Sequence, residues 1–300
     1  MTGKDAEPPV QEVSPKNTPI PEGLRVISYR ARLDVPIALV LFVSGLLAAR
    51  RRAVGTRKNT RRLGCYRQAV FALAWYRDRV SIPRLGAGFG LSQATAYRYL
   101  DEAAAVLAAR APGLQEALER ALAEGTPHVI LDGTLIGGDR CREKTTGHRY
   151  GKEIDAWYSG KNKAFGGNIQ GLFYPDGRPM WVSDVLPGRV NDLAAAKELV
   201  FAVLYPFTDR MPCLADGGYT PAGHGIHTPV KRPRGGPDLD ISAQARNMLL
   251  RSLRCLGERG FALLKQRWQT LQHVTASPGK IGQIAKAALV LTLFEHKMLT

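Results

Sequence analysis

The sequence is poor in the residues that build disulfide scaffolds and zinc sites. It has 4 cysteines and 6 histidines in 300 residues. The cysteines form no C-x-x-C pair, their spacing fits no zinc pattern, and no H-E-x-x-H motif occurs. We therefore expect no structural zinc, and we expect the cysteines to be small buried residues in a reducing cytosol.

Long hydrophobic runs are also missing. The longest, PIALVLFVSGLLAA at residues 36–49, falls short of the roughly 20 residues that span a bilayer. It follows an acidic and proline-rich stretch, which is atypical of a signal peptide. The run predicts a buried helix, and the protein is expected in the bacterial cytosol, associated with the nucleoid.

Acidic residues are scarce, with 26 Asp and Glu against 42 Lys and Arg, a formal net charge of +16. Such a charge favours a polyanionic partner, most often nucleic acid. The alternative is a generally basic protein whose charged faces are only solvated. A hydrophobic content of 45% is enough for a packed core.

The residue pattern changes near residue 124. Residues 1–22 are rich in proline and polar residues and predict a flexible tail. Residues 23–123 predict a helical domain. Residues 124–300 predict strands at 128–136, 167–174, 179–186, 212–216 and 225–230, with helices at 191–204, 241–274 and 281–298. This element order is that of an RNase H-like (retroviral-integrase-type) α/β domain behind an all-α domain.

The helical part contains a helix-turn-helix outline within about residues 63–110. A short helix near 82–86 leads to GAGFG, and Ser92 suits the N-cap of a second helix. The first residues of that helix would reach base edges, which makes Gln93, Thr95 and Arg98 candidate DNA contacts. Residues 50–62, RRRAVGTRKNTRR, hold seven basic residues in thirteen and suit phosphate binding. Any alanine-rich helical pair with a serine cap would look similar.

Two carboxylates stand at predicted strands. Asp132 lies inside the apolar strand VILDGTLI, where an unpaired buried carboxylate is costly. Asp216 ends PCLAD and is followed by GGYTP, whose glycines permit close approach of a ligand to the backbone. Either could instead be an ordinary Asp-Gly turn. Carboxylates that converge from separate elements suit Mg²⁺.

A third carboxylate, Glu258, is the one acid in RSLRCLGERGFALLKQRW, residues 251–268. At 100° per residue, Arg254, Glu258 and Lys265 lie within about 40° of one helix face. Glu258 could be a metal ligand flanked by phosphate-binding cations, or it could be one member of an ion pair.

Three blocks, ILDGT at 130–134, LADGGY at 214–219 and RCLGERGFALLK at 254–265, resemble the catalytic blocks of DDE-type insertion-sequence transposases related to the Harbinger group. Residues 159–193 resemble the same family. Its late helix often carries Tyr, Arg, Glu and Lys at set spacing. This sequence matches at Arg254, Glu258 and Lys265 and departs at Arg251, where the family often has Tyr.

The resemblance implies a DNA transposase in which Asp132, Asp216 and Glu258 hold two Mg²⁺ or Mn²⁺ ions for strand cleavage and strand transfer. It implies DNA contacts from Lys161, Lys163, Arg254 and Lys265, double-stranded element ends and target DNA as partners, and at least a homodimer during synapsis. Asp192 is a rival acid that we expect to cap a helix. Two alternatives stay open. One is a decayed or domesticated DNA-binding protein, and the other is a nuclease of the same fold without strand transfer.

Overall fold

The computed structural model describes residues 33–147 and 151–299, with the side chain of Glu258 left out. The predicted tail at residues 1–22 lies outside the described residues. From Asp34 onward the chain forms one compact unit.

Four helices form the amino-terminal part of this unit: α1 (Ile37–Ala53), α2 (Cys65–Asp78), α3 (Ile82–Gly88) and α4 (Gln93–Ala108). The apolar run at 36–49 became α1, which buries one face through Leu39, Val43 and Leu47. Ser92 caps α4, because its Oγ accepts a hydrogen bond from the backbone N–H of Thr95. The four helices lie where the sequence predicts a helical region.

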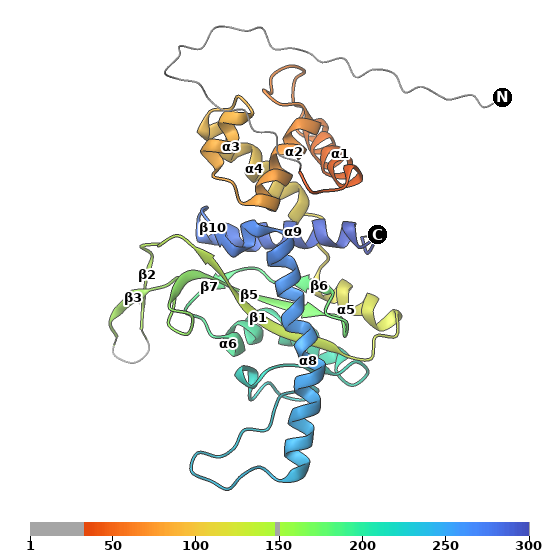
Figure 1. Cartoon of the computed structure of the whole chain (residues 1–300), viewed down its shortest axis with the longest axis vertical. Helices are drawn as coiled ribbons and strands as arrows, with labels where there is room; N and C mark the ends of the chain where they lie inside the picture. Colours follow the sequence, from red (N-terminus) through yellow and green to blue (C-terminus); the bar gives the residue numbers. More distant parts are fainter. Residues whose placement is uncertain (1–32, 148–150, 300) are drawn as a thin grey trace, which may run out of the picture. The chain divides into compact units, whose positions relative to one another are not determined.

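A mixed sheet forms the centre of the remaining chain (Figure 1). Its longest strands are β1 (Val129–Gly138) and β5 (Ala164–Phe173), which pair antiparallel, while β8 (Cys213–Leu214) pairs with β1 in parallel. The other strands of the sheet are β4 (Tyr158–Ser159), β6 (Pro179–Val182), β7 (Leu186–Pro187), β9 (Ile226–His227) and β10 (His273–Val274). A separate hairpin pairs β2 (Lys144–Thr146) with β3 (Glu153–Asp155). The chain is thus a mixed α/β protein, consistent with an RNase H-like nuclease fold.

Helices cover both faces of the sheet. Successive side chains of a strand point to opposite faces. Val129 and Leu131 enter a core with the helices α5 (Leu114–Ala123), α6 (Asp192–Leu199) and α7 (Phe201–Leu204). Ile130 points to the other face, where α8 (Ile241–Arg267) packs. Helix α5, which falls inside the predicted helical domain, therefore contributes to the core of the sheet.

Two glycines let α8 lie close to this face. A Cβ on Gly257 would overlap the Cγ2 of Ile130 on β1, and a Cβ on Gly260 would overlap the ring of Phe173 on β5. Phe173 also meets Phe261 edge to face, with 4.9 Å between ring centroids. Glu258 lies between the two glycines, so this close packing fixes the height of its backbone over β1.

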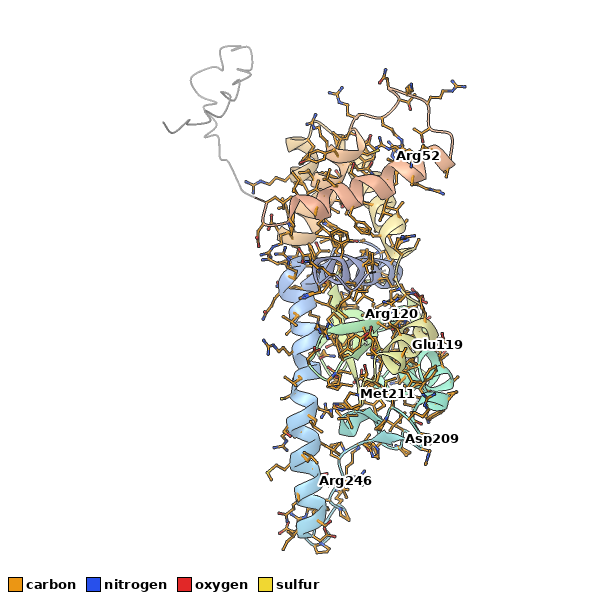
Figure 2. The ribbon with its side chains drawn as sticks, turned by 90° about the vertical axis from the view of Figure 1, so that its right-hand side faces the viewer. Arg52, Glu119, Arg120, Asp209, Met211 and Arg246 are labelled. Atoms are coloured by element: carbon orange, nitrogen blue, oxygen red, sulfur yellow. The ribbon has the colours of Figure 1, made fainter. Side chains whose placement is uncertain are left out.

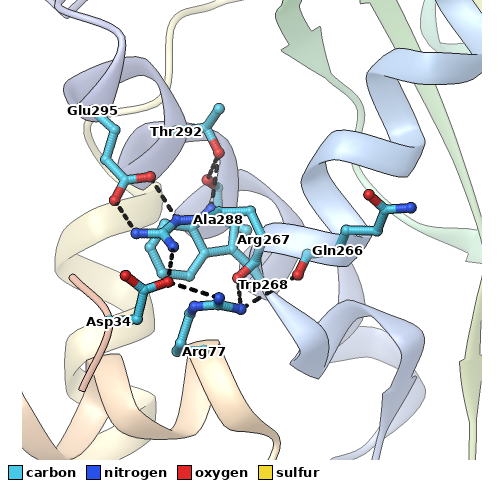
Figure 3. A network of polar contacts seen from close by, with 8 residues as sticks. All are labelled: Asp34, Arg77, Gln266, Arg267, Trp268, Ala288, Thr292 and Glu295. Carbon is cyan, nitrogen blue, oxygen red and sulfur yellow. Dashed lines mark hydrogen bonds and ion pairs between the residues drawn. The ribbon is translucent and has the colours of Figure 1, made fainter. Parts of the chain in front are cut away.

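The carboxyl end of α8 is fixed by polar contacts with α2 and with α9 (Ile281–Glu295) (Figure 3). Arg77 of α2 donates to the carbonyl oxygen of Arg267 at 3.2 Å and to Asp34 at 2.8 Å. The guanidinium of Arg267 binds both oxygens of Glu295, at 2.9 and 2.6 Å. The completely buried Trp268 donates its indole N–H to Thr292 of α9 at 2.8 Å.

These contacts explain one error of the sequence prediction. The helical pattern predicts a helix to residue 274, but α8 ends at Arg267 and β10 follows. Burial of Trp268 and pairing of His273 with Gly137 of β1 overrule the local pattern.

The expectation of buried cysteines is correct for Cys213 alone: Cys65 and Cys141 are partly exposed, and Cys255 is exposed. Across the described residues, no helix has both the length and the apolar character needed to cross a membrane.

The glycine contacts of α8 can be tested by stability. Gly260→Ala gains about 1 kcal/mol of helix propensity, but the added methyl overlaps Phe173, and overpacking costs about 1–3 kcal/mol. We expect Gly260→Ala to lower the free energy of unfolding, measured by urea denaturation. The control is Gly45→Ala in the middle of α1, where a Cβ meets nothing within 4 Å. That control should be stabilised, and equal stabilisation of both variants would contradict the packing described.

Candidate active site

Asp132 and Asp216 occupy the same level of two neighbouring parallel strands. Ile130 of β1 pairs with Leu214 of β8, and each carboxylate lies two residues beyond its paired residue. Two residues along a strand restore the same face, so Asp132 points to the face that Ile130 shares with α8. Asp216 lies two residues after the end of β8 and caps the short helix at Gly217–Tyr219, accepting a hydrogen bond from the N–H of Gly218 at 2.7 Å.

The proximity of these acids affects the protonation of Asp132. The pKa of Asp132 is raised from 3.8 to about 7, mainly by burial and also by the negative charges of Asp216 and Asp192, while the N–H of Gly133 and the charge of Arg254 oppose the shift. A carboxylate with this pKa holds a proton for part of the time at neutral pH, and a cation beside it would favour the ionised form.

Helix α8 contributes two cations to the same region. Arg254 lowers the pKa of Asp132, and Asp132 in turn favours the charged form of Lys265. Glu258 lies between these two residues along α8, and its side chain is outside the described part of the structure. Its backbone is therefore in the stretch of helix that passes over Asp132.

Lys265 makes contacts that the sequence did not predict. Its ammonium donates to the hydroxyl of Thr134 at 2.7 Å and to the carbonyl oxygen of Leu135 at 3.0 Å, both on β1. Burial lowers the pKa of Lys265 below 10.5. Through these two bonds Lys265 joins α8 to β1 at Thr134 and Leu135, two and three residues after Asp132.

Asp192 does not cap its helix, contrary to expectation. The cap of α6 is Asn191, whose Oδ1 accepts a hydrogen bond from the N–H of Ala194 at 2.9 Å. Asp192 is the first helical residue. Its carboxylate accepts from the ammonium of Lys161 at 2.9 Å and from the side-chain amide of Asn168 at 2.9 Å.

A buried polar chain continues from Asp192 beneath Asp132. The amide of Gln170 donates to the Oδ1 of Asn168 at 2.7 Å, and the hydroxyl of Tyr219 donates to the Oε1 of Gln170 at 2.7 Å. Tyr219 lies three residues after Asp216, so this chain connects the Asp216 turn to Lys161. The sequence analysis missed Asn168 and Gln170, because two amides within a long strand carry no recognisable spacing.

Lys161 and Lys163 both lie in the tight turn between β4 and β5, and both are exposed. Lys161 favours its charged form, mainly through Asp192 and also through Asp216 and Asp132, which raises its pKa. A pocket of about 170 Å³ opens beside it, lined by residues that include Gly133, Asn162 and Arg189. Lys161 is thus near the carboxylates, whereas no contact of Lys163 with them is found among the described residues.

The three candidate base contacts lie at the start of α4. Gln93 and Arg98 are exposed and Thr95 is partly exposed. Arg98 donates to the hydroxyl of Thr95 at 3.1 Å, and Ser92 donates to the same hydroxyl at 3.0 Å. Thr95 and Arg98 therefore lie on one side of α4, and Gln93, the first residue of the helix, lies about 140° around the helix from Arg98.

The basic segment at 50–62 divides into two groups. Arg51 donates to the carbonyl oxygen of Leu63, and Arg61 pairs with Glu102 at 3.2 Å, so these two hold the segment on α4 and the loop before α2. The other five basic residues are exposed, and Figure 2 shows Arg52 extending from the end of α1. They are Arg50, Arg52, Arg57, Lys58 and Arg62.

A protein-family model for the DDE superfamily endonuclease matches residues 131–292, more than half of the chain. The chain therefore belongs to the DDE superfamily endonuclease family and is a transposase-type nuclease. This match confirms the resemblance to DDE enzymes, while the relation to the Harbinger group stays a prediction.

A solved structure, the Mos1 transposase paired-end complex with left transposon end, is similar at 11% sequence identity over 72% of this chain and 80% of that chain, with a TM-score of 0.20. At this TM-score and identity, the similarity carries no conclusion about the fold or function of this chain. Comparison with curated proteins finds no match.

The family generally uses divalent metal ions, and the oxygen donors here suit such ions. Asp132 and Asp216 are two carboxylates at one level, and burial raises the pKa of Asp132, so a divalent cation beside it would favour the ionised form. Among the described side chains, no group of three Asp, Glu, His or Cys could hold a metal. That set excludes Glu258, which is the expected third ligand.

The raised pKa of Asp132 predicts a pH-dependent stability in metal-free protein. The folded-state pKa of about 7 exceeds the ordinary value of 3.8. Between these values the folded state holds a proton that the unfolded chain has lost, so stability falls as pH rises through that window. Asp132→Asn should therefore gain stability relative to wild type, by on the order of 1 kcal/mol or more, between about pH 5 and about pH 8. Urea denaturation in chelator measures this. The exposed Asp238→Asn, whose partner Arg232 stays charged throughout this range, should show no such trend. A pH-independent effect of Asp132→Asn would contradict the assigned pKa shift.

Proposed function

We propose that the protein is a DNA transposase that binds the ends of its element, cleaves DNA with divalent metal ions and joins the cut ends to target DNA. The observation that carries this proposal is the pairing of β1 with β8, which brings Asp132 level with Asp216 under the helix that bears Glu258. The overall charge of +16 supports DNA as the partner.

Asp132, Asp216 and Glu258 would hold two Mg²⁺ or Mn²⁺ ions. When bound, such ions supply activation of the attacking water or 3′-hydroxyl and stabilise the leaving oxygen. Carboxylate oxygens from three separate elements are the donors that these ions prefer.

The cations around the carboxylates take different roles. Lys265, bonded to Thr134 and Leu135, holds α8 against β1 and so positions Glu258. Arg254 lies near Asp132 and would contact the phosphate that enters between them. Lys161, whose side chain is exposed, would turn from Asp192 to a DNA phosphate, and Asp192 would keep its hydrogen bond from Asn168. Lys163 would contact DNA farther from the reacting phosphate.

Recognition of the element ends is assigned to the helical part. Helices α3 and α4 would act as a helix-turn-helix, in which Gln93, Thr95 and Arg98 read base edges of the terminal inverted repeats. The exposed arginines and lysine of residues 50–62 would bind phosphates nearby. Synapsis of two ends implies a homodimer or a larger assembly, acting in the bacterial cytosol at the nucleoid.

Two other functions make different predictions. A decayed or domesticated transposase would bind DNA specifically and cut none. A nuclease of the same fold would cut DNA without joining the 3′ ends to a target. The three carboxylates favour an active enzyme over a decayed one. The products formed on labelled DNA distinguish a transposase, which joins cut ends to a target, from a nuclease, which only cuts.

The carboxylate assignment is tested with a labelled duplex that carries the end of the element. Asp132→Asn, Asp216→Asn and Glu258→Ala should each abolish Mg²⁺-dependent cleavage and strand transfer and leave DNA binding intact, because ligands that act as a unit fail together. Asp209→Asn, an exposed acid on a loop, is the matched control and should be fully active. Activity in Glu258→Ala equal to wild type would make Glu258 a structural residue.

Recognition by α4 is tested by fluorescence anisotropy. Arg98→Ala should weaken binding to the terminal-repeat duplex by about 1–3 kcal/mol and reduce discrimination against a scrambled duplex. Arg110→Ala, an exposed arginine beyond the other end of α4, serves as control and should retain discrimination. If both variants weaken binding equally to both duplexes, Arg98 contacts only phosphate.

A further inference from the structure

The first half of α8 has an uncovered apolar stripe. Ile241, Met248 and Leu249 are 86%, 71% and 60% exposed, values that are unusual for large hydrophobic residues of one helix. Spacings of seven and eight residues place them on one side of the helix. In Figures 1 and 2 this half of α8 runs past the edge of the sheet, and among its described residues only Leu250 is buried before Gly257.

Positive charge borders the stripe on both sides. At 100° per residue, Arg246 lies about 110° to one side of the centre of the stripe and Arg251 about 110° to the other. Residues 241–257 contain no acid. The preceding loop adds exposed Lys231 and Arg234.

The charges argue against a second copy of the chain as the occupant. Pairing two such stripes would bring arginine borders together, and the two nearby acids are already engaged. Asp238 pairs with Arg232 at 2.8 Å, and Asp240 accepts the N–H of Ala243 at 2.6 Å as the cap of α8. Like charges that face each other across an interface oppose association.

Duplex DNA satisfies both features of this surface. Proteins that bend DNA insert Leu, Ile or Met side chains between base steps through the minor groove, with basic residues on the adjoining phosphates. We propose that the first half of α8 is a DNA-distorting arm. Met248 and Leu249 enter the minor groove and unstack a base step, while Arg246 and Arg251 bind the flanking phosphates.

The position of the arm limits where the distortion occurs, and this step rests on the proposed function. Met248 and Leu249 precede Glu258 by nine to ten residues, which is about 14 Å along a helix. At about 3.4 Å per base pair, that is about four base pairs from the scissile phosphate. Ile241, at about 26 Å, reaches seven to eight base pairs. The unstacked step should fall between these limits.

The test uses full-length protein and element-end duplexes with 2-aminopurine at successive positions up to about eight base pairs from the cut. Wild type should raise the fluorescence at one or two of these positions. The double variant Met248→Gln/Leu249→Gln should lose that rise and bind about tenfold more weakly, about 1.4 kcal/mol. Ile37→Gln/Leu41→Gln, which changes two exposed apolar residues of α1, is the matched control and should behave as wild type.

The arginines have a separate readout. Arg246→Ala/Arg251→Ala should lower the slope of log Kd against log salt by about 1.8, the value for two lost phosphate contacts. Circular dichroism verifies that each variant is folded.

Four results would overturn the proposal. The first is an unchanged fluorescence rise and affinity in Met248→Gln/Leu249→Gln. The second is a Met248→Gln/Leu249→Gln protein that loses a dimer seen for wild type in sedimentation but still distorts DNA, which would assign the stripe to a second copy. The third is a wild type that binds no DNA, which would also end the proposed function. The fourth is Mg²⁺-dependent cleavage by wild type together with stripe variants that leave cleavage, fluorescence and affinity unchanged. It would reject the arm and leave the proposed function standing.

Discussion

A buried carboxylate, Asp132, lies level with a second carboxylate, Asp216, on neighbouring parallel strands, and the charged groups around this pair depend on that arrangement. Burial and the neighbouring acids raise the pKa of Asp132 to about 7. Arg254 and Lys265 of α8 interact electrostatically with Asp132. The negative charges of Asp192, Asp216 and Asp132 raise the pKa of Lys161. The positive charge in this part of the chain is thus arranged around a negative centre that a divalent ion would complete.

Helix α8 links that centre to the rest of the molecule. Gly257 and Gly260 allow it to lie directly on β1 and β5, and Lys265 ties it to β1. Beyond Arg267 the chain is fixed by Trp268 and by the contacts with Arg77. One end of the helix is therefore rigidly held, whereas the other end extends from the sheet with an apolar stripe uncovered. A helix with such unequal ends can position a carboxylate and still present a surface to a partner.

The sequence predicts the helices and strands better than it predicts the side-chain contacts between them. The places of Asp132 and Asp216 at two strands could be predicted because each combines a carboxylate with an apolar strand and a glycine, while their role at the site stays a prediction. The helix containing Glu258 was predicted from periodicity. The early end of that helix was not, because burial of Trp268 depends on α2 and α9, which are distant in the sequence.

Long-range polar pairing also escaped prediction. Asp192 was expected to cap a helix because it precedes LAAAKEL, yet Asn191 does so, and Asp192 instead meets Lys161 across a turn of the sheet. The chain from Tyr219 through Gln170 to Asn168 depends on the pairing of β5 with β1, which no local pattern reveals. The DNA contact expected of Lys265 stays a prediction, and the bond from its ammonium to Thr134 was not predicted.

We propose that Asp132, Asp216 and Glu258 converge on divalent ions. The most direct test is anomalous diffraction from crystals of the wild-type protein soaked in Mn²⁺. We expect strong anomalous peaks between the carboxylates of Asp132 and Asp216, with Glu258 within ligand distance. Peaks that lie elsewhere, or a Glu258 side chain turned away from an occupied Asp132–Asp216 pair, would contradict it.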